Sequence, residues 1–131
     1  MPHRVVVTGW GVLSSIGHTA DAYWANLSRG ACGIAPATIS SADLLAQKVV
    51  AEVKDYDPAR HFEERQITPL DRVSQFGVVA AREAIAHSGL TFDGGLAERT
   101  ATIVGCGAGG HLTLDESYKR LYRDSAKRLH P

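Results

Sequence analysis

Hydrophobic residues recur along the chain at spacings that predict strands and helices in alternation. Residues 5–8 are four β-favouring residues in a row, and they lead into Gly9 and Gly11 within the stretch VVVTGWGVLSSIG. Thr19 is then a suitable N-cap for a short amphipathic helix that ends before Gly30. The first turn and the apolar stripe of this helix are expected to hold Asp21, Tyr23, Trp24 and Leu27.

The middle of the chain is predicted to be rich in loops, and a long helix follows it. Residues 31–47 are mostly small or turn-forming, residues 48–53 have strand character, and Asp57-Pro58 marks a turn. From about residue 69 to residue 87, apolar residues recur at helical spacing, and Gly89 stands where a helix-ending glycine belongs. Small residues on its surface suit a helix that is buried on several sides. The periodic positions are Val73, Phe76, Ala80, Ala84 and Ile85.

The last third of the chain predicts a strand, a glycine loop and a helix. Residues 100–104 are expected to form the strand, and the loop GCGAGG follows at residues 105–110. A helix is expected from about residue 114 to residue 129, since apolar residues and i,i+4 charge pairs recur there. The order of elements favours a layered α/β fold with parallel strands. The residues concerned are Leu114, Tyr118, Leu121 and Tyr122 on the apolar side, with the pairs Asp115/Lys119 and Glu116/Arg120 outside.

Composition places the chain among globular proteins and limits its partners. Its 131 residues are 44% hydrophobic and 21% charged, which is typical of one domain with a buried core. Fourteen basic and fourteen acidic residues cancel, so no net field attracts nucleic acid or an anionic membrane. No apolar run approaches the roughly 18 residues that a spanning helix needs. We expect no nucleic-acid partner, no membrane partner and a reducing, cytoplasmic location.

The cysteines and histidines do not predict a metal site. Cys32 and Cys106 are far apart, and neither belongs to a CxxC pair. The histidines lack the HxxxH or HxH spacing that would bring two of them to one metal ion, so surface or capping roles are expected. The six are His3, His18, His61, His87, His111 and His130.

The glycines near the N-terminus raise the hypothesis of a nucleotide site, which the sequence does not support. The dinucleotide fingerprint requires a third glycine, and Ser14 stands at that position. A P-loop Gly-Lys-Ser/Thr motif is also absent from the sequence. Gly9 and Gly11 are better interpreted as a turn that needs positive φ or close backbone approach. No cofactor is expected.

Three segments together resemble a known enzyme family. The stretch VVVTGWGVLSSIG, the helix LDRVSQFGVVAAREAIAHSGL at residues 70–90 and the segment TIVGCGAGG at residues 102–110 look like the N-terminal part of the β-ketoacyl-acyl carrier protein synthases. These are the elongating condensing enzymes of fatty-acid and polyketide synthesis. The resemblance covers nearly all 131 residues in order. It implies the N-terminal part of a thiolase-like fold, with αβα layers and a mixed sheet, incomplete in this chain.

The resemblance implies a decarboxylating Claisen condensation. In the family a cysteine holds the acyl chain as a thioester, two histidines assist decarboxylation of malonyl-carrier, and backbone amides stabilise the oxyanion. These residues correspond to positions beyond residue 131, so no catalytic residue is expected here and the chain alone should be inactive. Cys106 lies between glycines and is the alternative nucleophile in these residues, but the resemblance matches it to a family position usually filled by a small residue. Cys32 matches a small polar position in a turn.

The glycine loop is the expected contribution to substrate binding. In related synthases the loop that matches GCGAGG lies beside the acyl tunnel, and the residue that matches Ala108 is often a larger aliphatic that restricts chain entry. The resemblance therefore assigns Gly107, Ala108 and Gly109 to acyl binding. The alternative is that the glycines of residues 105–110 only form a strained turn.

The expected partner is an acyl carrier protein, but its docking surface departs from the family pattern. Many relatives carry a basic cluster before the core helix, whereas this chain reads HFEERQITPLD and keeps only Arg65. Either carrier docking here is in doubt, or the charge comes from the last helix, whose basic face could equally be an ordinary solvated one. The basic residues of that helix are Lys119, Arg120, Arg123, Lys127 and Arg128.

Residues 1–131 are interpreted as the N-terminal portion of a ketosynthase domain that is completed by the rest of the same fold. Isolated, such a portion would leave buried-type faces open, and exposed apolar faces favour association. A homodimer is expected at full length, as in most of the family. Two alternatives remain, a non-catalytic chain-length or scaffold partner of the same fold and an independent α/β binding module.

Overall fold

A computed structural model describes residues 4–39 and 42–125 of the chain. The chain divides into two compact units. The first unit comprises residues 1–56 and 79–90, and the second comprises residues 57–78 and 91–131. One long helix contributes residues to both units.

The first helix of unit 1 forms as the sequence predicts. Helix α1 spans Ala20–Ser28, and Thr19 caps it by accepting a hydrogen bond from the Ala22 N–H at 3.2 Å. Asp21 lies in the first turn, where a negative charge interacts favourably with the helix dipole. Gly30, with a φ of +71°, follows the end of the helix. A left-handed backbone at this position explains why a glycine is needed there.

The middle of unit 1 is mostly loop, as predicted, and contains one small sheet. Strand β1 (Ala35–Pro36) pairs with strand β2 (Val49–Val50) in antiparallel register, with Ala35 opposite Val50. A 3₁₀ turn, η1, lies between them at Ala42–Leu44. The strand expected at residues 48–53 is therefore present but short. The expectation of parallel strands is wrong for this pair, because parallel strands need a crossover, usually a helix, and the described residues between these two strands hold only a 3₁₀ turn.

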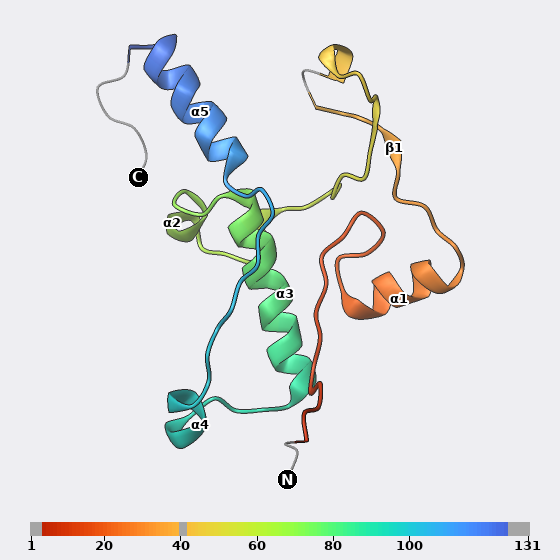
Figure 1. The fold of residues 1–131 in the computed structure, drawn as a ribbon, viewed down its shortest axis with the longest axis vertical. Coiled ribbons are helices and arrows are strands. Elements are labelled where there is room, and N and C mark those ends of the chain that lie inside the picture. Colours follow the sequence, from red (N-terminus) through yellow and green to blue (C-terminus); the bar gives the residue numbers. More distant parts are fainter. Residues whose placement is uncertain (1–3, 40–41, 126–131) are drawn as a thin grey trace. The chain divides into compact units, whose positions relative to one another are not determined.

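Helix α3 spans Arg72–Ser88 and confirms the long helix of the sequence prediction (Figure 1). Gly89 follows it with a φ of +63°, in the left-handed region expected of a helix-ending glycine. The expected burial on several sides is not observed, since Val73 and Ile85 keep 40% and 47% of their surface exposed. Within the described residues only part of the helix surface meets a neighbour. Val79 is buried at 8% exposure.

Unit 2 consists mainly of helices. A 3₁₀ turn, η2, spans Pro58–Arg60 and begins at Asp57, whose carboxylate accepts a hydrogen bond from the Ala59 N–H, so the predicted turn is confirmed. The short helices α2 (Glu64–Ile67) and α4 (Gly94–Glu98) were not predicted, because a single helical turn carries no apolar periodicity.

Helix α5 spans His111–Tyr122 and begins three residues earlier than the sequence predicts. Of the two expected i,i+4 ion pairs, Asp115/Lys119 forms, with the Lys119 ammonium 2.5 Å from the Asp115 carboxylate, whereas Glu116/Arg120 is not an ion pair among the described side chains. The Tyr118 and Tyr122 rings stack on one side, with centroids 5.9 Å apart. The predicted end of this helix near residue 129 lies outside the described residues.

Two strands expected from the sequence are not formed. Residues 5–8 and 100–104 make no sheet pairs within the described chain. Val5 is 89% exposed and Ile103 is 93% exposed. A β-strand is stabilised by hydrogen bonds to a neighbouring strand, and no described segment supplies one to either run. The described residues therefore hold only part of the layered fold with a mixed sheet, as expected of an incomplete portion.

A bilayer-spanning helix is not found among residues 4–39 and 42–125, because none of their helices combines the required length and apolar character.

Candidate functional site

The glycine loop of unit 2 joins the unpaired segment at residues 100–104 to helix α5. Gly110 is the N-cap of α5 and adopts a φ of +79°, which a side-chain-bearing residue would occupy at a cost. A Cβ on Gly109 would lie 2.5 Å from the Cys106 sulfur and 3.0 Å from Val73 Cγ1. Two of the loop glycines are therefore explained by backbone conformation or by close packing.

The predicted acyl-binding residues form the exposed part of this loop. Gly107, Ala108 and Gly109 are all exposed to solvent. A Cβ on Gly105 or Gly107 would meet no atom within 4 Å, so packing within the described residues does not require glycine at these positions. The strained-turn explanation thus accounts for Gly110 and leaves Gly105 and Gly107 unexplained.

Asp71 joins the start of α3 to the start of α5 within unit 2. One carboxylate oxygen accepts a hydrogen bond from the Val73 N–H at 3.0 Å. The other accepts from both the N–H and the hydroxyl of Thr113, at 3.0 and 2.7 Å. Sequence analysis did not identify Asp71, although an acidic residue just before a periodic apolar segment is a helix-start signal that could have found it.

These hydrogen bonds lower the pKa of the Asp71 carboxyl below its ordinary value of 3.8. The Thr113 hydroxyl contributes most and the Val73 N–H contributes next, while partial desolvation opposes them. Hydrogen bonds to the ionised form stabilise that form. Asp71 is therefore a carboxylate at neutral pH.

Replacing Asp71 by Asn is expected to make the free energy of unfolding depend less on pH in the acid range. Because the pKa is lower in the folded state than in the unfolded state, the carboxylate stabilises the fold above the unfolded pKa, and this contribution is lost as pH falls through the folded pKa. Acid unfolding of both proteins, followed by circular dichroism from pH 7 to about pH 2, measures the difference. Parallel pH profiles below about pH 4 would contradict the assignment.

Glu52 is an internal reference for that comparison. The hydroxyl and N–H of Thr38 lower the pKa of the Glu52 carboxyl, with the hydroxyl contributing most. Because Glu52 is present in both proteins, its share of the pH dependence cancels, and the difference between the profiles reports Asp71.

The glycines of the first motif are explained by close approach to α3 in unit 1. A Cβ on Gly9 would lie 2.7 Å from the Ser88 nitrogen and still closer to the Ala84 carbonyl oxygen. A Cβ on Gly11 would lie 2.8 Å from the Ala84 nitrogen and overlap the Ala80 carbonyl oxygen. The prediction of close backbone approach is confirmed. Packing against a helix explains both glycines without a phosphate ligand.

Glu83 of α3 secures this segment from the helix side. Its carboxylate accepts hydrogen bonds from the Val12 N–H at 2.8 Å and from the Ala20 N–H at 2.6 Å. Ala20 is the first residue of α1, so Glu83 places negative charge at a helix N-terminus and satisfies a free backbone donor there. Nothing in the local sequence indicates Glu83, because both partners are more than 60 positions away.

The two cysteines and His87 lie at the surface of the described chain. Cys32 and Cys106 are free and exposed. His87 lies at the surface of α3, where its Nδ1 is 3.3 Å from the Trp10 N–H. In the described ranges, no group of three or more His, Cys, Asp and Glu residues is placed to hold a metal ion. His3 and His130 lie outside those ranges.

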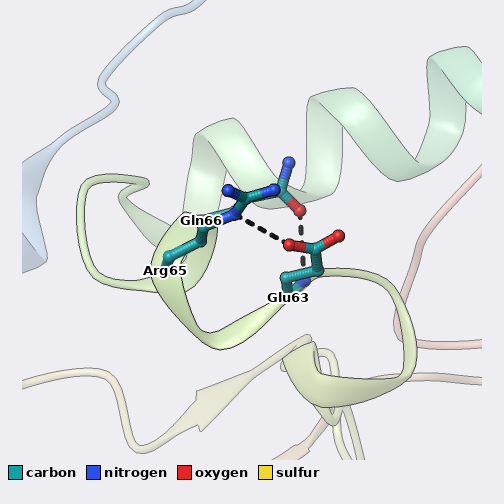
Figure 2. Close-up of polar contacts among 3 residues, drawn as sticks. All are labelled: Glu63, Arg65 and Gln66. Atoms are coloured by element: carbon teal, nitrogen blue, oxygen red, sulfur yellow. Dashed lines mark hydrogen bonds and ion pairs between the residues drawn. The ribbon is translucent and has the colours of Figure 1, made fainter.

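Arg65, the basic residue that the sequence keeps before the core helix, is paired with a neighbouring carboxylate. Figure 2 shows Arg65 turned toward Glu63, and its Nε lies 2.8 Å from the Glu63 carboxylate. The Gln66 amide oxygen accepts from the Glu63 N–H at 3.1 Å and so completes the first turn of α2. On α5, Lys119 is paired with Asp115, and Lys127 and Arg128 lie outside the described residues.

Comparison with known proteins yields consistent matches. Residues 3–131 match the family model of the β-ketoacyl synthase N-terminal domain. A 3-oxoacyl-[acyl-carrier-protein] synthase 2 of Staphylococcus aureus is 31% identical over 98% of this chain and 31% of its own length. Nodulation protein E of a Rhizobium species is 35% identical over 98% of this chain and 32% of its own length. The chain thus spans about a third of these relatives.

A solved structure agrees with the sequence matches. The ishigamide ketosynthase/chain length factor superposes with a TM-score of 0.58 and 36% identity, over 66% of this chain and 22% of that chain. The resemblance expected from the three sequence segments is therefore confirmed.

Proposed function

Because the chain belongs to the family of β-ketoacyl synthase N-terminal domains, with a thiolase-like fold, we propose that it forms the N-terminal portion of a 3-oxoacyl-(acyl carrier protein) synthase. The match over residues 3–131 is the observation that carries this proposal. The reaction is the condensation of an acyl thioester with malonyl-carrier protein, driven by loss of carbon dioxide.

The chain itself supplies binding surface to this reaction and no catalytic group. The nucleophilic cysteine and the two histidines of the family correspond to positions beyond residue 131, so residues 1–131 alone are inactive. Cys106 is free and exposed, and its sulfur lies 2.5 Å from where a Cβ on Gly109 would be, so in this proposal it belongs to the loop and not to the catalytic group.

The exposed loop at Gly107, Ala108 and Gly109 is the proposed acyl-contacting segment. Its backbone is held at Gly110 and Gly109, while Gly107 and Ala108 present little side-chain volume. Acyl chains bind best to surfaces from which water is removed at little free-energy cost. An alanine at position 108 also leaves room for additional methylene groups.

The test of the proposed function combines the intact mass of the purified protein with labelling by a cysteine-reactive condensing-enzyme inhibitor. One labelled cysteine outside residues 1–131, in a protein heavier than the 14.0 kDa of this sequence, is the expected result. Labelling of Cys106 or Cys32 that tracks with loss of condensing activity would overturn the assignment of the catalytic residues.

Ala108→Ile is expected to shorten the preferred acyl chain. Three added carbon atoms narrow the space beside the loop, and an extra methylene in an apolar pocket changes selectivity by about 10- to 200-fold. The measurement is kcat/KM over a series of acyl-carrier substrates of increasing length, with the ratio of long to short chains as the readout.

Ala97→Ile in α4 is the control for this series. Ala97 is also exposed but lies outside the glycine loop, so the ratio of long to short chains should not change. An unchanged ratio for Ala108→Ile in an active enzyme would remove Gly107, Ala108 and Gly109 from the acyl site.

A second candidate function is a non-catalytic chain-length partner of the same fold. The superposition on the ishigamide ketosynthase/chain length factor favours keeping this candidate. The inhibitor experiment separates the two, because a chain-length partner would not be labelled at an active-site cysteine.

The expected physiological setting is a cytoplasmic homodimer that accepts substrates from an acyl carrier protein. Pairing of Arg65 with Glu63 supports a docking surface away from α2, since a neutralised arginine contributes little to binding an acidic partner. An Arg65→Ala variant with an unchanged KM for acyl-carrier substrate would agree with this placement.

A further inference from the structure

The carboxylate of Asp71 is shared between two helix N-termini within unit 2. It accepts from the Val73 N–H at the start of α3 and from the Thr113 N–H and hydroxyl in the first turn of α5. The first N–H groups of a helix have no partner inside the helix, and a negative charge is favourable beside them. Asp71 satisfies one such group on each helix.

Fixing Thr113 also fixes one end of the glycine loop. Gly110 is the N-cap of α5, and its carbonyl accepts the first helical hydrogen bond from the Leu114 N–H at 3.0 Å. Only two residues separate Gly110 from Thr113, so the regular backbone of the first turn transmits the position of one to the other.

The second partner of Asp71 fixes the wall against which the loop packs. The Val73 N–H is bound to Asp71, and Val73 Cγ1 lies 3.0 Å from the position of a Cβ on Gly109. The same carboxylate therefore sets both the end of the loop and its neighbour. Ala108 directly precedes Gly109, so its placement depends on both contacts.

We infer that Asp71 is a positioning residue that holds the Gly107–Ala108–Gly109 loop and thereby sets acyl-chain selectivity. This inference rests on the proposed function of the loop. Asp71 acts through Thr113 and Val73 and touches no substrate itself. Because the two contacts with Thr113 are hydrogen bonds to a charged acceptor, they are stronger than neutral ones.

The test is Asp71→Asn in the intact synthase, with the ratio of kcat/KM for long and short acyl chains as the readout. Asparagine keeps one oxygen for the Val73 N–H, but its NH₂ group cannot accept from Thr113. A change of about tenfold in the ratio is expected, because hydrogen bonds to charged groups have this order of strength.

Variants of Thr113 probe the same contact from the other side and are less disruptive to folding. Thr113→Val removes the hydroxyl donor and should change the ratio of long to short chains in the same direction as Asp71→Asn. Thr113→Ser keeps the hydroxyl donor and should keep the wild-type ratio. Combining Asp71→Asn with Thr113→Val should give less than the sum of the two effects, since both remove one interaction.

Glu83→Gln is the control for general loss of stability. Glu83→Gln removes a hydrogen bond of unit 1 and does not touch the loop. Even if it lowers the thermal midpoint as much as Asp71→Asn does, the ratio of kcat/KM for long and short chains should stay unchanged. If Glu83→Gln shifts the ratio equally, selectivity follows stability and the inference is wrong.

The outcome for Ala108→Ile separates failure of the inference from failure of the proposed function. If Ala108→Ile shifts chain-length preference while Asp71→Asn and Thr113→Val do not, the loop is an acyl site that Asp71 does not position. If none of the three shifts the preference of an active enzyme, the loop does not contact the acyl chain, and the inference is overturned with it.

Discussion

Gly11→Ala is expected to lower the free energy of unfolding by about 3 kcal/mol, the upper part of the range for overpacking a tight contact. The added Cβ would overlap the Ala80 carbonyl oxygen and lie 2.8 Å from the Ala84 nitrogen. Both atoms belong to the backbone of α3, which cannot turn aside as a flexible side chain can. Chemical denaturation followed by circular dichroism measures the change.

Gly95→Ala in α4 is the matched control for this glycine substitution. A Cβ on Gly95 would meet no atom within 4 Å, so the substitution should be neutral or slightly stabilising. Equal stability of Gly11→Ala and the wild type would show that the segment at residues 9–11 does not lie against α3. Gly9→Ala should behave like Gly11→Ala, because it also meets helix backbone.

Glu83→Ala is expected to destabilise the protein by about 3 kcal/mol, because two hydrogen bonds to a charged, half-buried acceptor are lost together. The Val12 and Ala20 N–H groups now donate to the Glu83 carboxylate at 2.8 and 2.6 Å, and both would lose this acceptor. The start of α1 would also lose its nearby negative charge. Thermal unfolding and amide hydrogen exchange of residues 20–23 measure the effect.

Glu116→Ala on α5 is the control for removing a glutamate from a helix. Glu116 is exposed, so its substitution should change the free energy of unfolding by less than about 0.5 kcal/mol. Normal protection of the Ala20 amide in Glu83→Ala would contradict the assigned role of Glu83, whatever the change in thermal midpoint.

Local elements of this chain could be predicted because their determinants lie within a few residues. Thr19 caps α1 through the Ala22 N–H, and Gly30 and Gly89 end helices in left-handed conformations. Each of these features depends on side-chain oxygens or backbone freedom at one position. The short helices α2 and α4 escaped prediction because they lack the length to show a period.

Two of the predicted strands do not form, for a reason that local sequence cannot show. Residues 5–8 and 100–104 have the composition of strands, yet a strand needs a hydrogen-bonded neighbour. In the described residues neither run has one, so the apolar side chains of Val5 and Ile103 remain exposed.

The candidate site divides in the same way between sequence and structure. The motif GCGAGG indicated the loop and, through family resemblance, Gly107, Ala108 and Gly109. The link from Asp71 to Thr113 and the links from Glu83 to Val12 and Ala20 became visible only in three dimensions, because these partners lie 42 to 71 positions away in the chain. A carboxylate that bridges such distances leaves no periodic signal.

The sequence by itself therefore determined helices α1 and α3, the residues at their ends and the family, since these depend on local chemistry and on segments in a fixed order. Tertiary structure alone decided why Gly9 and Gly11 must be glycine and which carboxylates hold the two glycine segments. Those features arise when α3 packs against chain that is distant in sequence, and close packing tolerates neither an extra Cβ nor an unpaired amide.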